Sequence, residues 1–157
     1  MNEVAWEIAH SVDANASPTF AWAYMTNVAN WDDPPAKFEL DGPFTAGSRG
    51  TTRIPGQEPR HWRLREVNPM KSYTLEMAMD GAVMSFEWRF EGRADGGTRL
   101  TQHIVLQGES AAAYVAQVQS AFTSNLAPGM NRIAAAVERA EASTTDVGQR
   151  GPPDDLG

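Results

Sequence analysis

Residues 111–142 of the chain read AAAYVAQVQSAFTSNLAPGMNRIAAAVERAEA, a segment with the periodicity of a long amphipathic helix. Its apolar residues recur at spacings of three and four, and they are Val115, Val118, Phe122, Leu126, Met130, Ile133 and Val137. Ser110 stands before the segment as a candidate N-cap residue. Such a helix gains most of its stability by burying its apolar stripe, so we expect it to lie across a sheet. Because proline removes a helix hydrogen bond, we expect a kink or break at Pro128-Gly129.

The part of the chain before this helix has the two-residue alternation of half-buried strands. We expect strands over residues 3–12, around Phe38 and Leu40, and over residues 48–54, 60–67, 72–79, 82–91 and 98–107. The Asp80-Gly81 pair favours a two-residue hairpin turn, and tight turns between strands indicate an antiparallel sheet. An aromatic helix should follow the first strand, because Ser17-Pro18 supplies an N-cap residue and a first-turn proline.

The predicted strands divide into an apolar face and a charged face. The apolar face collects the aromatic and methionine side chains, whereas the other face carries Arg63, Arg65, Glu76, Glu87, Arg89 and Arg99. A curved sheet that wraps its apolar face around one long helix can enclose a cavity, and such cavities are mostly apolar with a few polar groups. A fully packed core is the alternative interpretation of the same aromatic stripe.

Composition limits the classes of partner. The chain has 157 residues with 41% hydrophobic and 21% charged residues, which is typical of one globular domain with a real core. A net charge of −7 favours solubility and disfavours nucleic acid and anionic membrane surfaces, which both require a basic patch. The absence of cysteine excludes disulfides and thiolate chemistry.

No targeting or membrane segment is expected. The first residues lack the basic start and apolar run of a signal peptide, and no stretch is apolar enough to span a bilayer, so we expect a cytoplasmic protein. Residues 1–142 form the predicted domain, and the composition of residues 143–157 predicts a disordered C-terminal tail.

Candidate ligand-binding residues are those that alternation directs inward from the sheet or that lie on or beside the helix stripe. They are Trp62, Tyr73, Met77, Trp88, Phe90, Gln102, Ile104, Phe122, Asn125, Leu126 and Met130. Gln102 is the sharpest polar candidate, because a buried amide needs a hydrogen-bond partner, either a ligand or a neighbouring group. Asn125 could reach the same pocket from the helix, but a solvated helix face is the favoured interpretation.

The three histidines supply no metal site and no clear catalytic base. His61 and His103 fall on the outer face by alternation, and His10 falls on the apolar face near the end of the first strand. Their spacing matches no metal-binding pattern, so we expect no metal. The Gly-rich run over residues 42–50 lacks the features of a phosphate loop and is interpreted as turn chemistry.

Several segments, in order along the chain, carry a resemblance to a known superfamily. They are residues 17–22 (SPTFAW), Trp31, residues 41–50 (DGPFTAGSRG), residues 66–69 (EVNP) and residues 96–100 (GGTRL). Over residues 3–142 the set resembles the SRPBCC superfamily, which includes START lipid-binding domains, polyketide cyclase/dehydrase-like proteins and Bet v 1-like allergens. The resemblance implies an α+β helix-grip fold, in which a seven-stranded curved antiparallel sheet wraps a long C-terminal helix and short helices follow the first strand.

The resemblance implies a function only in outline, because the superfamily is functionally broad. We expect binding of a small hydrophobic or amphipathic ligand, such as a lipid, polyketide or aromatic metabolite, in an internal cavity. Any catalysis would be cyclase- or dehydratase-like and would rest mainly on positioning. The alternatives are a chaperone-ATPase-activator-like protein-interaction module and a stress- or antibiotic-related binding module without turnover. No cofactor is expected, and the oligomeric state, monomer or dimer, stays open.

Overall fold

The computed structural model describes residues 4–31 and 35–150, with side chains through Thr144. The chain begins with β1 (Val4–Ala14), α1 (Pro18–Met25) and a short 3-10 helix, η1 (Val28–Asn30). Six strands follow, namely β2 (Lys37–Asp41), β3 (Arg49–Arg53), β4 (Arg60–Asn68), β5 (Ser72–Met79), β6 (Ala82–Gly92) and β7 (Thr98–Gln107). The chain then forms η2 (Ala111–Tyr114), α2 (Val115–Phe122) and α3 (Leu126–Arg150).

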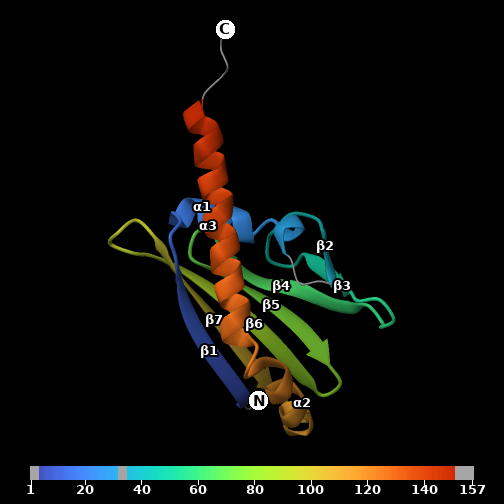
Figure 1. Cartoon of the computed structure of the whole chain (residues 1–157). Helices are drawn as coiled ribbons and strands as arrows, with labels where there is room; N and C mark the ends of the chain where they lie inside the picture. Colours follow the sequence, from blue (N-terminus) through green and yellow to red (C-terminus); the bar gives the residue numbers. More distant parts are fainter. Residues whose placement is uncertain (1–3, 32–34, 151–157) are drawn as a thin grey trace.

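All seven strands form one antiparallel sheet in the order β1-β7-β6-β5-β4-β3-β2. Strands β2 to β7 follow one another as a meander, and the last strand, β7, pairs with β1 along nearly the whole length of β1. The long helix α3 lies across the curved sheet, packs along β1 and also contacts α1 (Figure 1). This is the helix-grip architecture that the sequence predicts.

Alternation along the strands defines the two faces as expected. The inward side chains of the strands and helices form a single core, in which Leu64, Leu100, Ile104, Leu106, Met130 and Val137 are almost completely buried. The outward side of the sheet carries ion pairs such as Arg63–Glu76 and Arg99–Asp13. No helix in the described ranges combines the length and apolar character that crossing a membrane requires.

The break in the C-terminal helix is not where the sequence predicts it. The predicted kink at Pro128-Gly129 is wrong, because α2 ends at Phe122 and α3 begins at Leu126. The first hydrogen bond of α3 runs from the Gly129 N–H to the Asn125 carbonyl. Pro128 therefore lies in the first turn, where backbone N–H groups have no partner within the helix and proline costs nothing.

The structure tests three predictions about where the helices begin and end. Ser17 caps α1 as predicted, since its Oγ accepts a hydrogen bond from the Phe20 N–H. Ser110 makes no side-chain capping bond, so its predicted capping role is wrong. Helix α3 runs past residue 142 to Arg150, beyond the predicted end of the ordered part. Residues 151–157 of the predicted tail lie outside the described residues.

Two glutamates of α3 fasten the connection between β1 and α1. Glu138 Oε2 accepts from the Asn15 N–H at 2.6 Å, and Glu141 Oε2 accepts from Ser17 Oγ at 3.0 Å. The Ser17 N–H also donates to Glu141 Oε1 at 3.2 Å. These bonds join segments more than a hundred residues apart, and they fix the position of α1 over the inner face of the sheet. We call this set of contacts the Glu138–Glu141 clasp.

Candidate functional site

The inner face of the sheet carries a cluster of aromatic rings beneath α1. Phe44 and Tyr73 meet edge to face with ring centroids 5.0 Å apart, and Trp22 meets Phe90 in the same way at 5.1 Å. Such edge-to-face pairs align the positive edge of one ring with the negative face of the next. The cluster therefore forms a rigid apolar wall at the α1 end of the space between sheet and helices.

Tyr73 places a hydroxyl group inside this wall. Its side chain is 2% exposed, and no hydrogen bond of its hydroxyl to another described residue is present. Burial raises the pKa of the Tyr73 phenol, because the interior penalises the charged phenolate, so the group stays a neutral donor. A buried hydroxyl without a hydrogen-bond partner is uncommon in folded proteins. The Tyr73 hydroxyl is therefore available to donate a hydrogen bond to a polar group of a ligand.

Tyr73 belongs to a row of residues that crosses the sheet at one level. Register pairs His10 of β1 with Gln102 of β7, Gln102 with Trp88 of β6, and Trp88 with Tyr73 of β5. Directly opposed residues of antiparallel strands have Cβ atoms about 5 Å apart. An imidazole, an amide and a phenol thus lie in one row of the apolar inner face, which we call the polar row.

The helices do not fully cover the middle of the inner face. Leu75, Met77 and Met79 on β5 and Phe86 on β6 are only half-buried, although they point inward from the two central strands. Helix α3 packs along β1 at the sheet's edge, and Phe122 of α2 reaches Phe86 with ring centroids 5.8 Å apart. The exposed parts of these side chains form an apolar surface beside the polar row.

The structure separates the predicted ligand-binding residues into three groups. Trp62, Tyr73, Trp88, Phe90, Ile104, Leu126 and Met130 are buried in the core. Met77, Gln102 and Phe122 are half-buried and face the incompletely covered surface. Asn125 is exposed in the connection between α2 and α3, and its Nδ2 donates to the Ala121 carbonyl.

His10 is an inward polar residue that the predicted set of ligand-binding residues does not include. Alternation placed it on the apolar face, but the expected strand ended at residue 12 and left His10 near its end. The strand continues to Ala14, and His10 is half-buried in the polar row beside Gln102. Pairing of β1 with β7 produces this neighbour, and the two residues are too far apart in sequence for any local pattern to reveal it.

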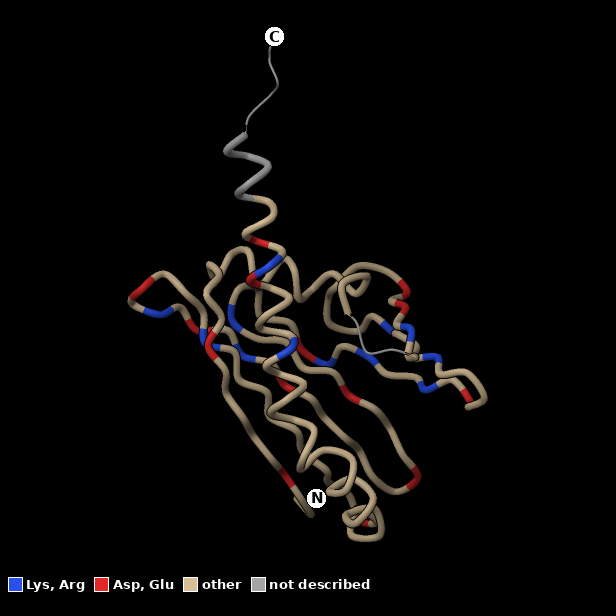
Figure 2. Tube along the Cα trace, in the orientation of Figure 1, with Lys and Arg blue, Asp and Glu red and all other residues tan. Residues whose placement is uncertain are grey.

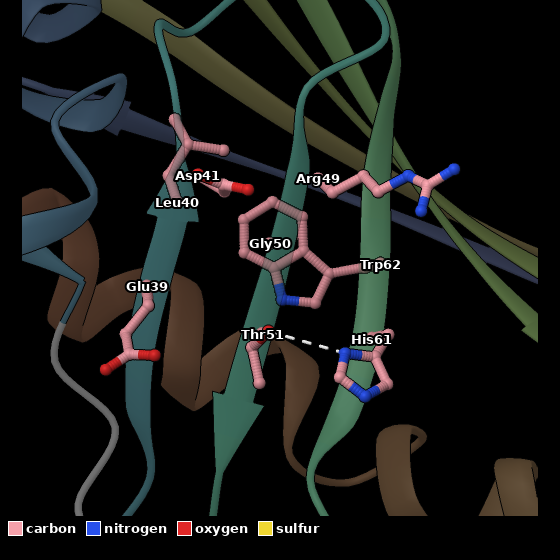
Figure 3. Close-up of a pocket in the computed structure, with 8 residues that line it drawn as sticks. All are labelled: Glu39, Leu40, Asp41, Arg49, Gly50, Thr51, His61 and Trp62. Carbon is pink, nitrogen blue, oxygen red and sulfur yellow. Dashed lines mark hydrogen bonds between the residues drawn. The ribbon is translucent and has the colours of Figure 1, made fainter.

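A separate pocket of about 690 Å³ opens at β2, β3 and β4 (Figure 3). It is lined by Glu39, Leu40, Asp41, Arg49, Gly50, Thr51, His61 and Trp62. Of these, only Trp62 belongs to the predicted site. The Trp62 indole packs directly over Gly50, where a Cβ atom would lie 2.2 Å from the ring, and its Nε1 donates to Thr52 Oγ1 at 3.0 Å.

A second pocket, of about 460 Å³, lies beside η1 and the start of β2. Neither pocket is lined by a residue of α2 or α3. The cavity expected between the sheet and the long helix therefore stays a prediction. Within the described residues, no group of three or more acidic or histidine side chains is arranged to hold a metal ion.

Solved structures with the same fold include proteins of several kinds. Norcoclaurine synthase from Thalictrum flavum, a point mutant in complex with a transition-state analogue, is 13% identical and superposes with a TM-score of 0.69, over 90% of this chain and 98% of that one. The ZhuI aromatase/cyclase of a Streptomyces species is 16% identical, with a TM-score of 0.64 over 88% of this chain and 95% of its own. A protein from Mycobacterium smegmatis is 17% identical, with a TM-score of 0.60 over 90% and 98%.

These identities are low enough that the likeness concerns the fold alone. No curated protein sequence matches the chain. One family model does match, over residues 5–138, which include all the strand residues except Val4 and about half of α3. The aromatic wall and the polar row both lie within this range. The chain therefore belongs to the family described as polyketide cyclase / dehydrase and lipid transport.

Proposed function

We propose that this protein binds a small hydrophobic or amphipathic molecule against the inner face of β5, β6 and β7. The observation that carries the proposal is the half-buried state of Met77 and Phe86 at the centre of the sheet. Apolar side chains at such positions are normally covered, because each square ångström of apolar surface left in water costs about 25 cal/mol. A ligand that covered this surface would recover that free energy. Methionine side chains suit ligands of varied shape.

The polar row supports the amphipathic part of the proposal. Gln102 can donate and accept hydrogen bonds, His10 can do either according to its tautomer, and the neutral Tyr73 phenol can donate. A lipid, polyketide or aromatic metabolite with one carbonyl or hydroxyl group would place that group in the row and its apolar body over Met77 and Phe86. Membership of the family supports this class of ligand.

The same row supplies what a cyclase- or dehydratase-like reaction would need. His10 is an inward titratable side chain of the type most often used for general acid–base steps. Gln102 lies opposite it and could orient a ligand carbonyl. We propose turnover as secondary to binding, because positioning of a reactive chain would supply most of the reduction in the barrier.

The test introduces a bulky side chain on the inner face of β5, where it should block the proposed surface. The control introduces the same side chain on the outer face of that strand. Met77→Trp places an indole at the half-buried inner position, whereas Ala78→Trp places the same indole at the exposed neighbour on the outer face. We expect Met77→Trp to weaken binding of the fluorescent dye anilinonaphthalene sulfonate about tenfold, equivalent to about 1.4 kcal/mol. Ala78→Trp should leave the affinity unchanged.

Equal affinities in the two variants, with thermal melting showing that both are folded, would contradict the proposal. If Met77→Trp fails to fold, Met79→Trp probes the same strand and face. Native mass spectrometry of protein purified from its own host then identifies the ligand. A stoichiometric small molecule that is lost after solvent extraction would name the chemical class. An empty protein that the dye and a lipid panel leave unchanged would favour the protein-interaction alternative.

A further inference from the structure

The outer face of β3 and β4 concentrates positive charge in an otherwise acidic chain. Four of the thirteen Lys and Arg residues lie on the outer face of these two strands, and they are Arg49, Arg53, Arg63 and Arg65. Several basic positions lie along β3 and β4 in Figure 2. The chain as a whole carries a net charge of −7, so this concentration is not a consequence of composition.

Within this cluster, two arginines oppose each other directly. Register pairs Arg49 of β3 with Arg63 of β4, and like charges directly opposite in an antiparallel pair destabilise the sheet. The Arg49 side chain extends from β3 across β4, away from the strand that carries Asp41 (Figure 3). Asp41 is also paired in register with Arg49, yet no ion pair of Arg49 is present among the described residues.

Two of the nearby carboxylates are already engaged by other arginines. Glu76 forms ion pairs with two guanidinium groups, that of Arg63 at 2.8 Å and that of Arg65 at 3.3 Å. Glu39 is engaged by Arg53 at 3.2 Å. Arg63 and Arg65 thus share a single carboxylate, and Arg49 has no ion pair among the described residues, although Asp41 stands opposite it in register.

We propose that Arg49 and Arg63, together with the pocket lined by Arg49, Thr51 and His61, bind a phosphate-type oxyanion on the outer face of the sheet. Guanidinium groups match phosphate oxygens in geometry and form charge-assisted hydrogen bonds with them. Thr51 Oγ1 and His61 Nδ1 lie 3.4 Å apart at the same pocket and add a hydroxyl and an imidazole. An anion between the two arginines would turn their repulsion into attraction. This site is on the opposite face of the sheet from the polar row.

The test compares the melting temperatures of the wild type and of Arg49→Gln, with and without the anion. Thermal melting is measured for the full chain at constant ionic strength while sodium phosphate or pyrophosphate replaces chloride. We expect the melting temperature of the wild type to rise saturably with either anion. Arg49→Gln should melt at a higher temperature than the wild type in chloride alone, because the like-charge pair is removed. Its half-saturation for phosphate should be weaker by about tenfold.

The matched control is Arg89→Gln, which removes an outer-face arginine on β6 that already has a partner, Glu87, at 3.3 Å. It should keep the wild-type response to phosphate. A wild type that responds no more to phosphate than to chloride, or an Arg49→Gln variant that keeps the full response, would overturn the proposal. Glycerol 3-phosphate is tested in the same way to identify the source of the oxyanion. Tighter binding than that of inorganic phosphate would indicate that the ligand is a phosphorylated small molecule, and equal binding would indicate that it is free phosphate.

Discussion

At the scale of single residues, the close contact between Gly50 and Trp62 constrains the packing of β3 against β4. We expect Gly50→Ala to destabilise the protein by about 1–3 kcal/mol, because the new Cβ would meet the Trp62 ring at 2.2 Å and the indole would have to leave its place. Gly129→Ala is the control, since its Cβ would have ordinary contacts in the first turn of α3 and should stabilise the helix. Chemical denaturation measures both, and an unchanged Gly50→Ala midpoint would show that Trp62 can move freely.

Single residues also show which features of the candidate site could be predicted from the sequence. Alternation correctly directed Trp62, Tyr73, Trp88, Phe90 and Ile104 into the interior, because a period of two fixes the face of each residue. Alternation could not tell which inward side chains are sealed in the core and which stay accessible, because that depends on where the helices lie. It also could not show that Trp62 fills the space above Gly50, since strand pairing brings them together.

At the scale of elements, the Glu138–Glu141 clasp joins the middle of α3 to the segment that leads into α1. We expect Glu141→Ala to lower the free energy of unfolding by about 1 kcal/mol, because Ser17 loses the acceptor for both its N–H and its hydroxyl. Glu109→Ala removes the same charge from an exposed position outside the helices and should have little effect. Equal loss in the two variants would point to net charge as the cause and not to the clasp.

The elements themselves were predicted more reliably than their ends. Each of the seven strands and the aromatic helix was recognised from periodicity and from turn and cap residues. The break in the C-terminal helix was placed at Pro128 because proline is the strongest local signal, yet a proline in a first turn breaks nothing. The actual break, between Phe122 and Leu126, carries no glycine or proline, so local composition gave no sign of it.

At the scale of the whole molecule, the division into a domain over residues 1–142 and a tail over 143–157 is a prediction that truncation can test. The last fully buried side chain of α3 is Val137, and the last clasp residue is Glu141, whereas Ala142, Ser143 and Thr144 are exposed. We therefore expect a chain ending at residue 142 to melt within about one degree of the full chain, since exposed surface residues contribute little.

A chain ending at residue 136 supplies the comparison, because it lacks Val137 and the whole clasp. Deleting a buried aliphatic side chain costs about 1 to 3 kcal/mol, and the lost clasp bonds add to it, so its melting temperature should fall by about ten degrees or more. Circular dichroism measures both transitions. A large loss already at residue 142 would mean that the later turns of α3, and not only the part that grips the sheet, belong to the folded unit, and the boundary would then move toward Arg150.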